Sequence, residues 1–208
     1  MDREYWNKFY SSTSITETRS DFAQFCKDNY VVDFGKLIDI GCGNGRDTLF
    51  FSKNNIPCIG IDQSSEVIEI NNKKKDELML ETHFFEGNFS TFNYDEVSKK
   101  EYSIYSRFTL HAINYDDEEK LFNNLKNQSL LKYLLIEVRS INDSLYGKGN
   151  KVGIHEYVTS HYRRFIDPLV LKENLSKNFK IIHFSESRGY AKIGDNDPCL
   201  IRVIAKKI

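Results

Sequence analysis

Short apolar runs alternate along the chain with segments in which apolar residues recur every three or four positions. The short runs are typical of buried strands, whereas the longer segments have the periodicity of amphipathic helices. Strands are predicted at residues 36–40, 56–61, 82–85, 102–105 and 131–138, and helices at 16–29, 46–53, from 64 onward, 116–128 and 167–177. This alternation of strands and helices is typical of an α/β domain.

Several of the expected helices carry their own start signals. Ser64 and Asp167 are expected N-caps, and Asp167 precedes Pro168, a residue favoured at the first helical position. The four acidic residues at 116–119 suit the positive amino end of another helix. The apolar side chains at helical spacing are Phe22, Phe25, Cys26, Val67, Ile68, Leu171 and Leu175.

The order of these elements predicts the topology. Consecutive strands joined by helices run parallel with right-handed crossovers, whereas the last two strands, at 180–185 and 199–205, have no helix between them and should pair antiparallel. We expect one domain over residues 1–208, a three-layer, Rossmann-like α/β fold with a mostly parallel sheet of about seven strands and a C-terminal antiparallel hairpin. Residues 142–162 and 188–197 fit neither period, and loops this long are usually functional or disordered.

Composition and charge narrow the range of functions. The 29 basic and 30 acidic residues nearly cancel and are dispersed, which disfavours a nucleic-acid partner. The first ten residues lack the apolar segment of a signal peptide, and no later run is long enough to span a bilayer, so a cytoplasmic protein is expected. The cysteines are far apart and form no C-x-x-C pair, which argues against a metal site and a disulfide framework. They are Cys26, Cys42, Cys58 and Cys199.

The stretch LIDIGCGNGRDT, residues 37–48, carries the main functional signal. Gly41, Gly43 and Gly45 follow a predicted strand and open a predicted helix, where a side-chain-free backbone lets a ligand approach at the carboxyl edge of the sheet. Asp62 lies at the end of the next strand, twenty-one residues after Gly41. A carboxylate in that place accepts hydrogen bonds from ribose hydroxyls, so the pattern predicts a nucleoside-containing ligand.

The glycine spacing separates two kinds of nucleoside site. Dinucleotide-binding folds usually have G-x-G-x-x-G, whereas this chain has G-x-G-x-G preceded by Asp39. Here the sequence resembles the class I S-adenosylmethionine-dependent methyltransferases, whose first motif looks like LIDIGCGNG. The segments IGIDQS at 59–64, FFEGNFS at 84–90 and YSIYSRFTLHAI at 102–113 are similar to later motifs of that family. A glycine turn that holds a different ligand, such as NAD, is the alternative.

The resemblance implies S-adenosylmethionine as the cofactor and assigns roles by position. The backbone from Gly41 to Gly45 would lie against the methionine portion, with Asp39 hydrogen-bonding nearby and Asp62 holding the ribose. The other implied contacts are Gln63, Asn88 and Phe89 around the adenine, and Ser106 and Arg107 beside the sulfonium. Many relatives have Asp where Asn88 stands, so a charge is missing there.

The amino-terminal segment, residues 1–30, is interpreted as a helical cap over the cofactor. Its aromatic residues Tyr5, Trp6 and Tyr10 fit either a lid or ordinary packing. Arg19 would reach the carboxylate of the cofactor from the same side.

Candidate acceptor contacts follow the fourth and fifth predicted strands. His111 is a candidate base or acceptor anchor, although a histidine in so apolar a run is as often structural. Glu137 and Arg139 end the fifth strand, where family members often place substrate contacts. The loop at 140–165 then contains three glycines that can act as hinges.

The end of that loop, HYRRF, brings together His161, the second candidate catalytic residue, and Tyr162, Arg163 and Arg164. Guanidinium groups bind oxyanions through paired hydrogen bonds, so Arg139 and the two adjacent arginines suit an anionic acceptor. Alternatively, the tandem arginines form surface ion pairs with Asp167 and Glu156, as at least one of them should because neighbours on an extended chain point in opposite directions.

The segments LYGKGNKVG and HYRRF also resemble a subset of bacterial methyltransferases associated with surface-polysaccharide assembly. That resemblance ranks a phosphate or phosphoramidate oxygen first among small-molecule acceptors, a sugar hydroxyl second and an unrelated metabolite third. SRFT stands after the fourth strand in place of the N-P-P-[YF] motif of base methylation, which lowers the odds for nucleic acid. A methyltransferase fold that serves only as a non-catalytic binding module is the competing class.

Overall fold

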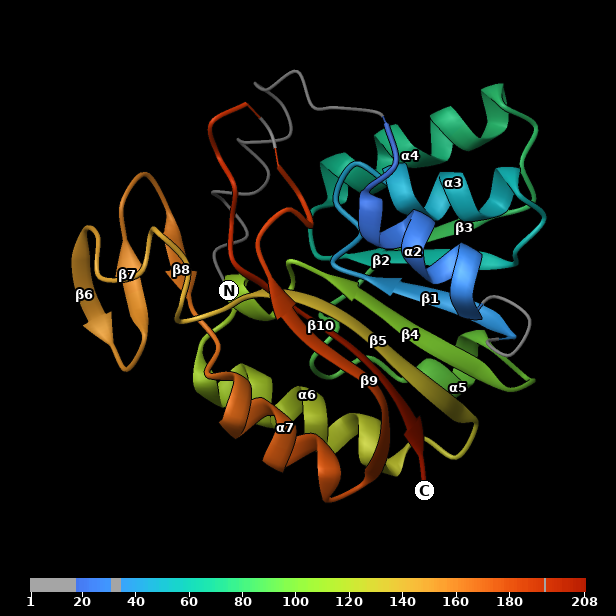
Figure 1. Ribbon diagram of the computed structural model, residues 1–208. Coiled ribbons are helices and arrows are strands. Elements are labelled where there is room, and N and C mark those ends of the chain that lie inside the picture. Colours follow the sequence, from blue (N-terminus) through green and yellow to red (C-terminus); the bar gives the residue numbers. More distant parts are fainter. Residues whose placement is uncertain (1–17, 31–34, 193) are drawn as a thin grey trace.

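A seven-stranded sheet forms the centre of the molecule (Figure 1). The computed structural model describes residues 18–30, 35–192 and 194–208. The strands lie in the order β3-β2-β1-β4-β5-β10-β9, and β10 is antiparallel to both of its neighbours, whereas the other pairs are parallel. Their bounds are β1 Lys36–Ile40, β2 Cys58–Asp62, β3 His83–Glu86, β4 Tyr102–Arg107, β5 Leu131–Arg139, β9 Phe179–Ser187 and β10 Leu200–Lys207.

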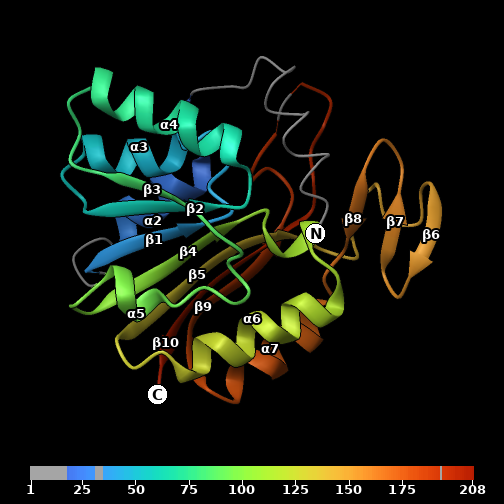
Figure 2. The ribbon, with the colours of Figure 1, turned by 180° about the vertical axis from the view of Figure 1, so that it is seen from behind.

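Helices cover both faces of this sheet. In Figures 1 and 2, α2, α3 and α4 lie on one face, and α5, α6 and α7 lie on the other. The bounds are α2 Asp21–Tyr30, α3 Arg46–Lys53, α4 Ser65–Glu77, α5 Tyr94–Val97, α6 Tyr115–Asn127 and α7 Pro168–Ser176, with a 3-10 helix, η2, at Leu110–Ala112. The predicted three-layer α/β fold and its C-terminal antiparallel pair are therefore confirmed.

Most element boundaries follow from local chemistry. Ser64 Oγ accepts a hydrogen bond from Val67 N, and Asp167 Oδ1 accepts one from Leu169 N, so both expected N-caps form. The helix predicted from residue 16 instead begins at Asp21, because Ser20 Oγ caps it by accepting from Ala23 N at 3.0 Å. The predictions at 36–40 and 46–53 have the observed bounds.

Alternation along the strands divides the core between the two faces. Ile38 packs in the larger cluster, on the side of α6 and α7, whereas its neighbour Leu37 packs on the side of α2 and α3. The expected inward positions Leu171 and Leu175 belong to the first cluster, and Phe22 and Cys26 belong to the second. Burial of both faces explains why the central strands read as nearly continuous apolar runs.

A second, three-stranded sheet was not predicted. It lies beyond the end of the main sheet in both views and consists of β6 Asn150–Gly153, β7 Glu156–Val158 and β8 Tyr162–Arg164, all paired antiparallel (Figures 1 and 2). This region was expected to be a loop. Its strands have only three or four residues and are mostly half-buried or exposed, so their sequence shows no clear alternation.

Arg164 attaches this small sheet to the main body. Its buried guanidinium forms an ion pair with Glu118 of α6 and donates to the carbonyls of Ile113 and Leu110, at 3.1 and 3.4 Å. The backbone adds a hydrogen bond from Ile166 N to Arg139 O at 2.9 Å. The segment β8 is thereby fixed against η2, directly after β4.

All four cysteines are buried with free thiols. Among the residues that the structure describes, no helix is both long and apolar enough to cross a membrane, and no cluster of His, Cys, Asp or Glu side chains could hold a metal ion.

Replacing Arg164 should destabilise the protein much more than replacing its neighbour. Arg164→Met leaves the buried Glu118 carboxylate without its cation, and we expect this to lower the free energy of unfolding by about 3 to 5 kcal/mol. Arg163→Met, at a more exposed position, should cost less than about 1 kcal/mol. Urea denaturation measures both values. The double variant Arg164→Met/Glu118→Leu should recover most of the loss, and an Arg164→Met protein as stable as wild type would contradict this role.

Candidate functional site

The chain leaves the sheet in opposite directions after β1 and after β4. It enters α3 on one face and η2 and α6 on the other, although the two strands are neighbours. Such a switch point leaves a crevice at the carboxyl ends of the strands, where α/β proteins bind ligands. Because the register sets Ile40 beside Ser106, the segments 41–45 and 107–111 border this crevice.

The glycine turn occupies the β1 side of the crevice. Gly41, Gly43 and Gly45 have φ values of 65°, 53° and 71°, in the left-handed region that side chains rarely adopt. A Cβ at Gly41 would lie 2.9 Å from Thr109 Oγ1, and one at Gly45 would lie 2.9 Å from the Phe84 ring. The glycines are thus required by the turn's own angles and packing.

Two side chains that sequence reasoning missed hold this turn in place. Thr109 Oγ1 donates to Ile40 O at 2.7 Å, and Asn71 Nδ2 donates to Gly43 O at 2.7 Å. Thr109 comes from the segment after β4, and Asn71 comes from α4. Neither residue has a local pattern that marks it, because each acts on a partner far away in the sequence.

Asp62 ends β2 and reaches back to the turn. Its Oδ2 accepts from Gly43 N and its Oδ1 accepts from Ser64 N, both at 3.0 Å. Burial raises the pKa of Asp62, and these backbone hydrogen bonds oppose the rise. Each carboxylate oxygen keeps a second lone pair, so Asp62 can hold the turn and also accept from the hydroxyls of a ligand.

A second carboxylate network lies beneath the turn. Asp39 Oδ2 accepts from Thr48 Oγ1 at 2.6 Å, and burial, followed by the nearby Asp47, raises the pKa of Asp39 well above its usual value. Asp47 accepts from the backbone N and the Oγ of Ser20 and from the Tyr105 hydroxyl, each at 2.7 Å. This network joins the start of α2 to the first turn of α3.

The buried polar atoms without a hydrogen-bond partner in the described parts of the chain include three at this edge, besides Asn71 Oδ1 next to Gly45. The three are Gln63 Nε2 after β2, Ser106 Oγ in β4 and His111 Nδ1 in η2. Unpaired buried polar atoms are rare in folded proteins and are commonly satisfied by a ligand or by water. Together with the side-chain-free turn and the Asp62 carboxylate, they fit a cofactor that carries ribose hydroxyls, an amine and purine nitrogens.

Two other residues assigned to cofactor binding from the sequence have side chains that make contacts within the protein. The Phe89 ring is 3% exposed and packs in the main core, and Asn88 is exposed with its Oδ1 accepting from Ser90 N. We therefore assign the Phe89 ring to packing, while a contact from Asn88 stays a prediction. The aromatic residues of segment 1–17 lie outside the described residues.

Arg19 lies at the outer side of the glycine turn. Its guanidinium is 3.4 Å from both Ser20 O and Asp21 Oδ1, and with Asn44 it lines a cavity between α3 and α4. The expected contact with the cofactor's carboxylate therefore also stays a prediction.

Positive charge gathers around two histidines on the β4 side of the crevice. His111 is 7% exposed, and burial, followed by the charges of Arg139, Arg163, His161 and Arg107, lowers its pKa well below the usual value. Burial together with Arg163 and Arg139 lowers the pKa of His161 to about 4. Both imidazoles are therefore neutral at pH 7 and face arginine side chains.

Buried carboxylates hold two of these arginines. Glu137 Oε1 accepts from Arg107 Nε at 2.9 Å, its Oε2 accepts from Arg202 Nε at 2.7 Å, and Asp143 Oδ2 accepts from Arg139 Nη1 at 2.7 Å. Burial raises the pKa of Glu137, and its two arginines oppose the rise. Both carboxylates form ion pairs with arginines, so neither is placed to act as a proton acceptor.

The tandem arginines point in different directions. Tyr162 and Arg164 both donate to Ile113 O, whereas Arg163, on the alternate face of β8, donates to Thr159 Oγ1 at 2.6 Å and acts on both histidines. The ion pairs considered for Arg164 from the sequence are replaced by the one with Glu118. We therefore leave Tyr162 and Arg164 out of the candidate acceptor site.

Comparisons with known proteins support the cofactor half of the site. Residues 37–129 match the model of a methyltransferase domain, which covers β1 to α6 and so includes the glycine turn, Asp62 and His111. No curated protein matches the sequence.

Solved structures resemble the whole chain. An S-adenosylmethionine-dependent methyltransferase from Anabaena variabilis is 19% identical with a TM-score of 0.75, covering 99% of this chain and 93% of its own. The glycopeptide N-methyltransferase MtfA, solved with S-adenosylmethionine, is 15% identical with a TM-score of 0.64, and the match covers 89% of this chain and 94% of MtfA. The [4+2]-cyclase SpnF is 13% identical with a TM-score of 0.73, covering 99% and 94%. At these identities the likeness shows the fold.

Changing Asp62 should weaken cofactor binding. Asp62→Asn directs an amide N–H at the backbone N–H of Gly43 or Ser64 and removes the charge, so we expect at least about a tenfold loss of affinity for S-adenosylhomocysteine. Isothermal titration calorimetry measures it, and Glu86→Gln, at the exposed end of β3, is the control. Unchanged affinity of Asp62→Asn would place the cofactor elsewhere.

The two neutral histidines should make stability depend on pH. A histidine whose pKa is lowered by folding binds its proton more weakly in the native state, so stability is lost as the pH falls below the unfolded pKa of about 6.5. Between pH 7 and 5, wild type should lose on the order of 1 kcal/mol more than His111→Asn/His161→Asn, allowing for partial exposure of His161. Urea denaturation at the two pH values tests this, with the exposed His83→Asn as control. Equal losses would show that these imidazoles titrate normally.

Proposed function

The chain belongs to the class I S-adenosylmethionine-dependent methyltransferases, and we propose that it methylates a small molecule at an oxygen that is already anionic. Its cofactor is S-adenosylmethionine, which supplies an activated sulfonium methyl group when bound. The proposal depends on one observation, the gathering of arginines around the two histidines. The Arg107 and Arg139 guanidinium groups lie 4.1 and 5.7 Å from the centroid of the Phe108 ring, whose centroid is 5.1 Å from that of His111, and Arg163 acts on both histidines.

The cofactor contacts follow from the residues at the edge of the sheet. Asp62 would accept from the ribose hydroxyls while its other lone pairs hold the turn, and Gln63 Nε2 would donate to the adenine. The turn from Gly41 to Gly45 offers backbone groups to the methionine portion. Ser106 Oγ, unpaired within the described residues, would meet the polar groups nearest the sulfonium.

The side chains described at the site include no well-placed proton acceptor, which favours a methyl acceptor that needs no general base. A neutral hydroxyl must lose its proton during transfer, whereas a phosphate or carboxylate oxygen carries charge beforehand. His111 is a poor proton acceptor because burial, followed by the nearby arginines, disfavours its cationic form, and Glu137 and Asp143 are bound to arginines. His111 and His161 would instead act as neutral hydrogen-bonding groups that orient the acceptor.

The charge of the site favours the same conclusion. Arg139 and Arg163 face the histidines from β5 and from the small sheet, and guanidinium groups bind oxyanions with well-defined geometry. Arg107 adds positive charge from the end of β4. Among small-molecule acceptors we rank a phosphate or phosphoramidate oxygen first, as in a surface-polysaccharide precursor. Outside the anionic class, a sugar hydroxyl ranks second and an unrelated metabolite third.

A non-catalytic binding module on the same fold is the competing proposal. It predicts a protein that binds S-adenosylmethionine without consuming it, or that fails to bind it. The [4+2]-cyclase among the similar folds illustrates that this architecture hosts other functions. Detection of S-adenosylhomocysteine as a product decides between the two.

A panel of acceptors tests the proposed class. S-adenosylhomocysteine release should occur with phosphate monoesters, phosphoramidates or carboxylates of small molecules and not with the matching neutral alcohols. On the best acceptor, Arg163→Ala should raise KM at least about tenfold and change kcat less, because it removes a binding charge. Lys151→Ala, an exposed cation of the same small sheet, should leave both values unchanged. Turnover of neutral alcohols alone, or an unaltered KM in Arg163→Ala, would refute the anionic acceptor.

A further inference from the structure

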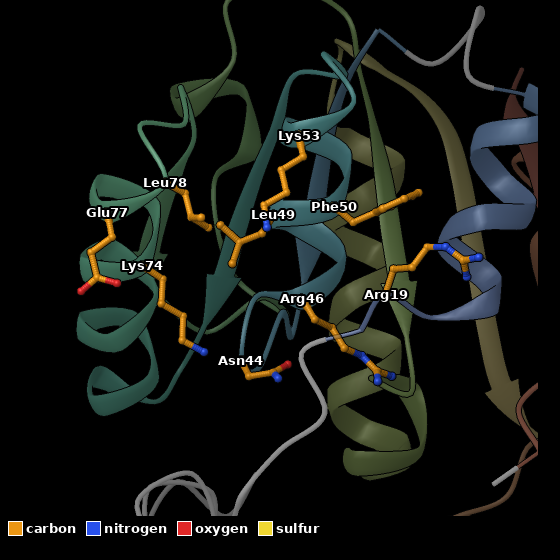
Figure 3. Close-up of a pocket in the computed structure, with 9 residues that line it drawn as sticks. All are labelled: Arg19, Asn44, Arg46, Leu49, Phe50, Lys53, Lys74, Glu77 and Leu78. Atoms are coloured by element: carbon orange, nitrogen blue, oxygen red, sulfur yellow. The ribbon is translucent and has the colours of Figure 1, made fainter.

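A cavity of about 360 Å³ lies outside the cofactor crevice, between α3 and α4 (Figure 3). One wall comes from a single stripe of α3, at Arg46, Leu49, Phe50 and Lys53, and the other comes from α4, at Lys74, Glu77 and Leu78. Asn44 of the glycine turn and Arg19, which lies on the side of the Phe50 ring, complete the lining. The volume falls in the lower part of the range of small-molecule sites.

The charged side chains that line this cavity are mostly cationic. The described residues that line it include four cations, Arg19, Arg46, Lys53 and Lys74, and one anion, Glu77. This differs from the chain as a whole, which has 29 basic and 30 acidic residues. Positive charge concentrated in a concave site raises the local concentration of small anions.

The rest of the lining is apolar. Leu49 is buried, Leu78 is exposed just after the end of α4, and Phe50 extends from α3 toward Arg19. The Arg19 guanidinium lies 5.7 Å from the centroid of the Phe50 ring, a distance at which the ring favours a cation. A matching ligand would therefore combine an apolar part, such as a ring, with at least two negative charges.

We propose that this cavity is a second ligand site, separate from the acceptor site, for a small phosphate ester with an apolar group. The cations of both helices would hold the phosphate, and Leu49, Phe50 and Leu78 would contact the apolar group. Arg46 also donates to Thr18 O at 3.4 Å, so the site adjoins the chain just before α2.

The cavity also borders the cofactor turn. Asn44 lies between Gly43 and Gly45, and Figure 3 shows Lys74 extending from α4 toward it. One helical turn before Lys74, Asn71 holds Gly43 O. A ligand between the helices would therefore touch the elements that fix the glycine turn, while the acceptor arginines lie across the crevice on β4, β5 and β8.

Calorimetric titration with phenyl phosphate at pH 8, where a phosphate ester carries about two negative charges, tests the proposal. The protein is saturated with S-adenosylhomocysteine throughout. Phenyl phosphate should bind more tightly than inorganic phosphate because of its ring, and phenol should not bind. The double variant Lys53→Glu/Lys74→Glu should weaken the binding of phenyl phosphate at least about tenfold, since it replaces two positive charges by two negative ones.

Matched variants separate this site from the acceptor site. Lys99→Glu/Lys100→Glu makes the same charge change at two exposed positions before β4 and should leave binding unchanged. Arg163→Ala should also leave it unchanged. The proposal is overturned if wild type saturated with S-adenosylhomocysteine does not bind phenyl phosphate, or if Arg163→Ala impairs binding and Lys53→Glu/Lys74→Glu does not. The last result would assign the anion to the acceptor site and leave the proposed methylation intact.

Discussion

The hydrogen bond from Gly43 N to the Asp62 carboxylate is the contact on which the cofactor site depends. It ties the turn after β1 to the end of β2, and Ser64 N binds the second oxygen of the same carboxylate. One side chain therefore sets the distance between the turn that would face the methionine portion and the carboxylate that would face the ribose. The left-handed angles of the turn persist because Thr109 and Asn71 fix it from two other elements.

In the proposed acceptor site, buried ion pairs orient the side chains. Arginines at the ends of β4 and β5 are held by wholly buried carboxylates, so their guanidinium groups are oriented before any ligand arrives. Arg202 shares Glu137 with Arg107 and stacks on Tyr190, at 4.1 Å from the ring centroid, which extends this support into the β9–β10 hairpin. The acids that orient the arginines are unavailable as bases, and burial, together with the arginines, lowers the pKa of both histidines. Pre-organisation of the arginines for an anion, as proposed, thus goes with the lack of a general base.

The parts that the sequence predicts are those whose determinants lie close together in the chain. The strands, the caps at Ser64 and Asp167, and the relation of the glycine turn to Asp62 all depend on local spacing and on the repeat of the α/β unit. The missed parts depend on contacts between distant segments. Thr109 acts on Ile40, 69 positions earlier, and Arg164 acts on Glu118, 46 positions earlier. Tandem arginines look equivalent in a sequence, and only the placement of β8 against η2 separates Arg163 from Arg164.

The same division explains why the cofactor is easier to identify than the acceptor. The matched domain ends at residue 129, before β5, so it contains the turn, Asp62 and His111 but neither Arg139 nor Arg163. The cofactor groups come from consecutive units at one edge of the sheet, and their chemistry follows from the fold. The proposed acceptor site comes from β5 and from a small sheet whose strands carry little signal of their own. The small sheet is joined to the body through Arg164, through Tyr162, whose hydroxyl donates to Ile113 O, and through backbone bonds such as the one from Ile166 N to Arg139 O. Because an α/β fold can carry many chemistries on such surface segments, the fold alone identifies the cofactor but not the acceptor.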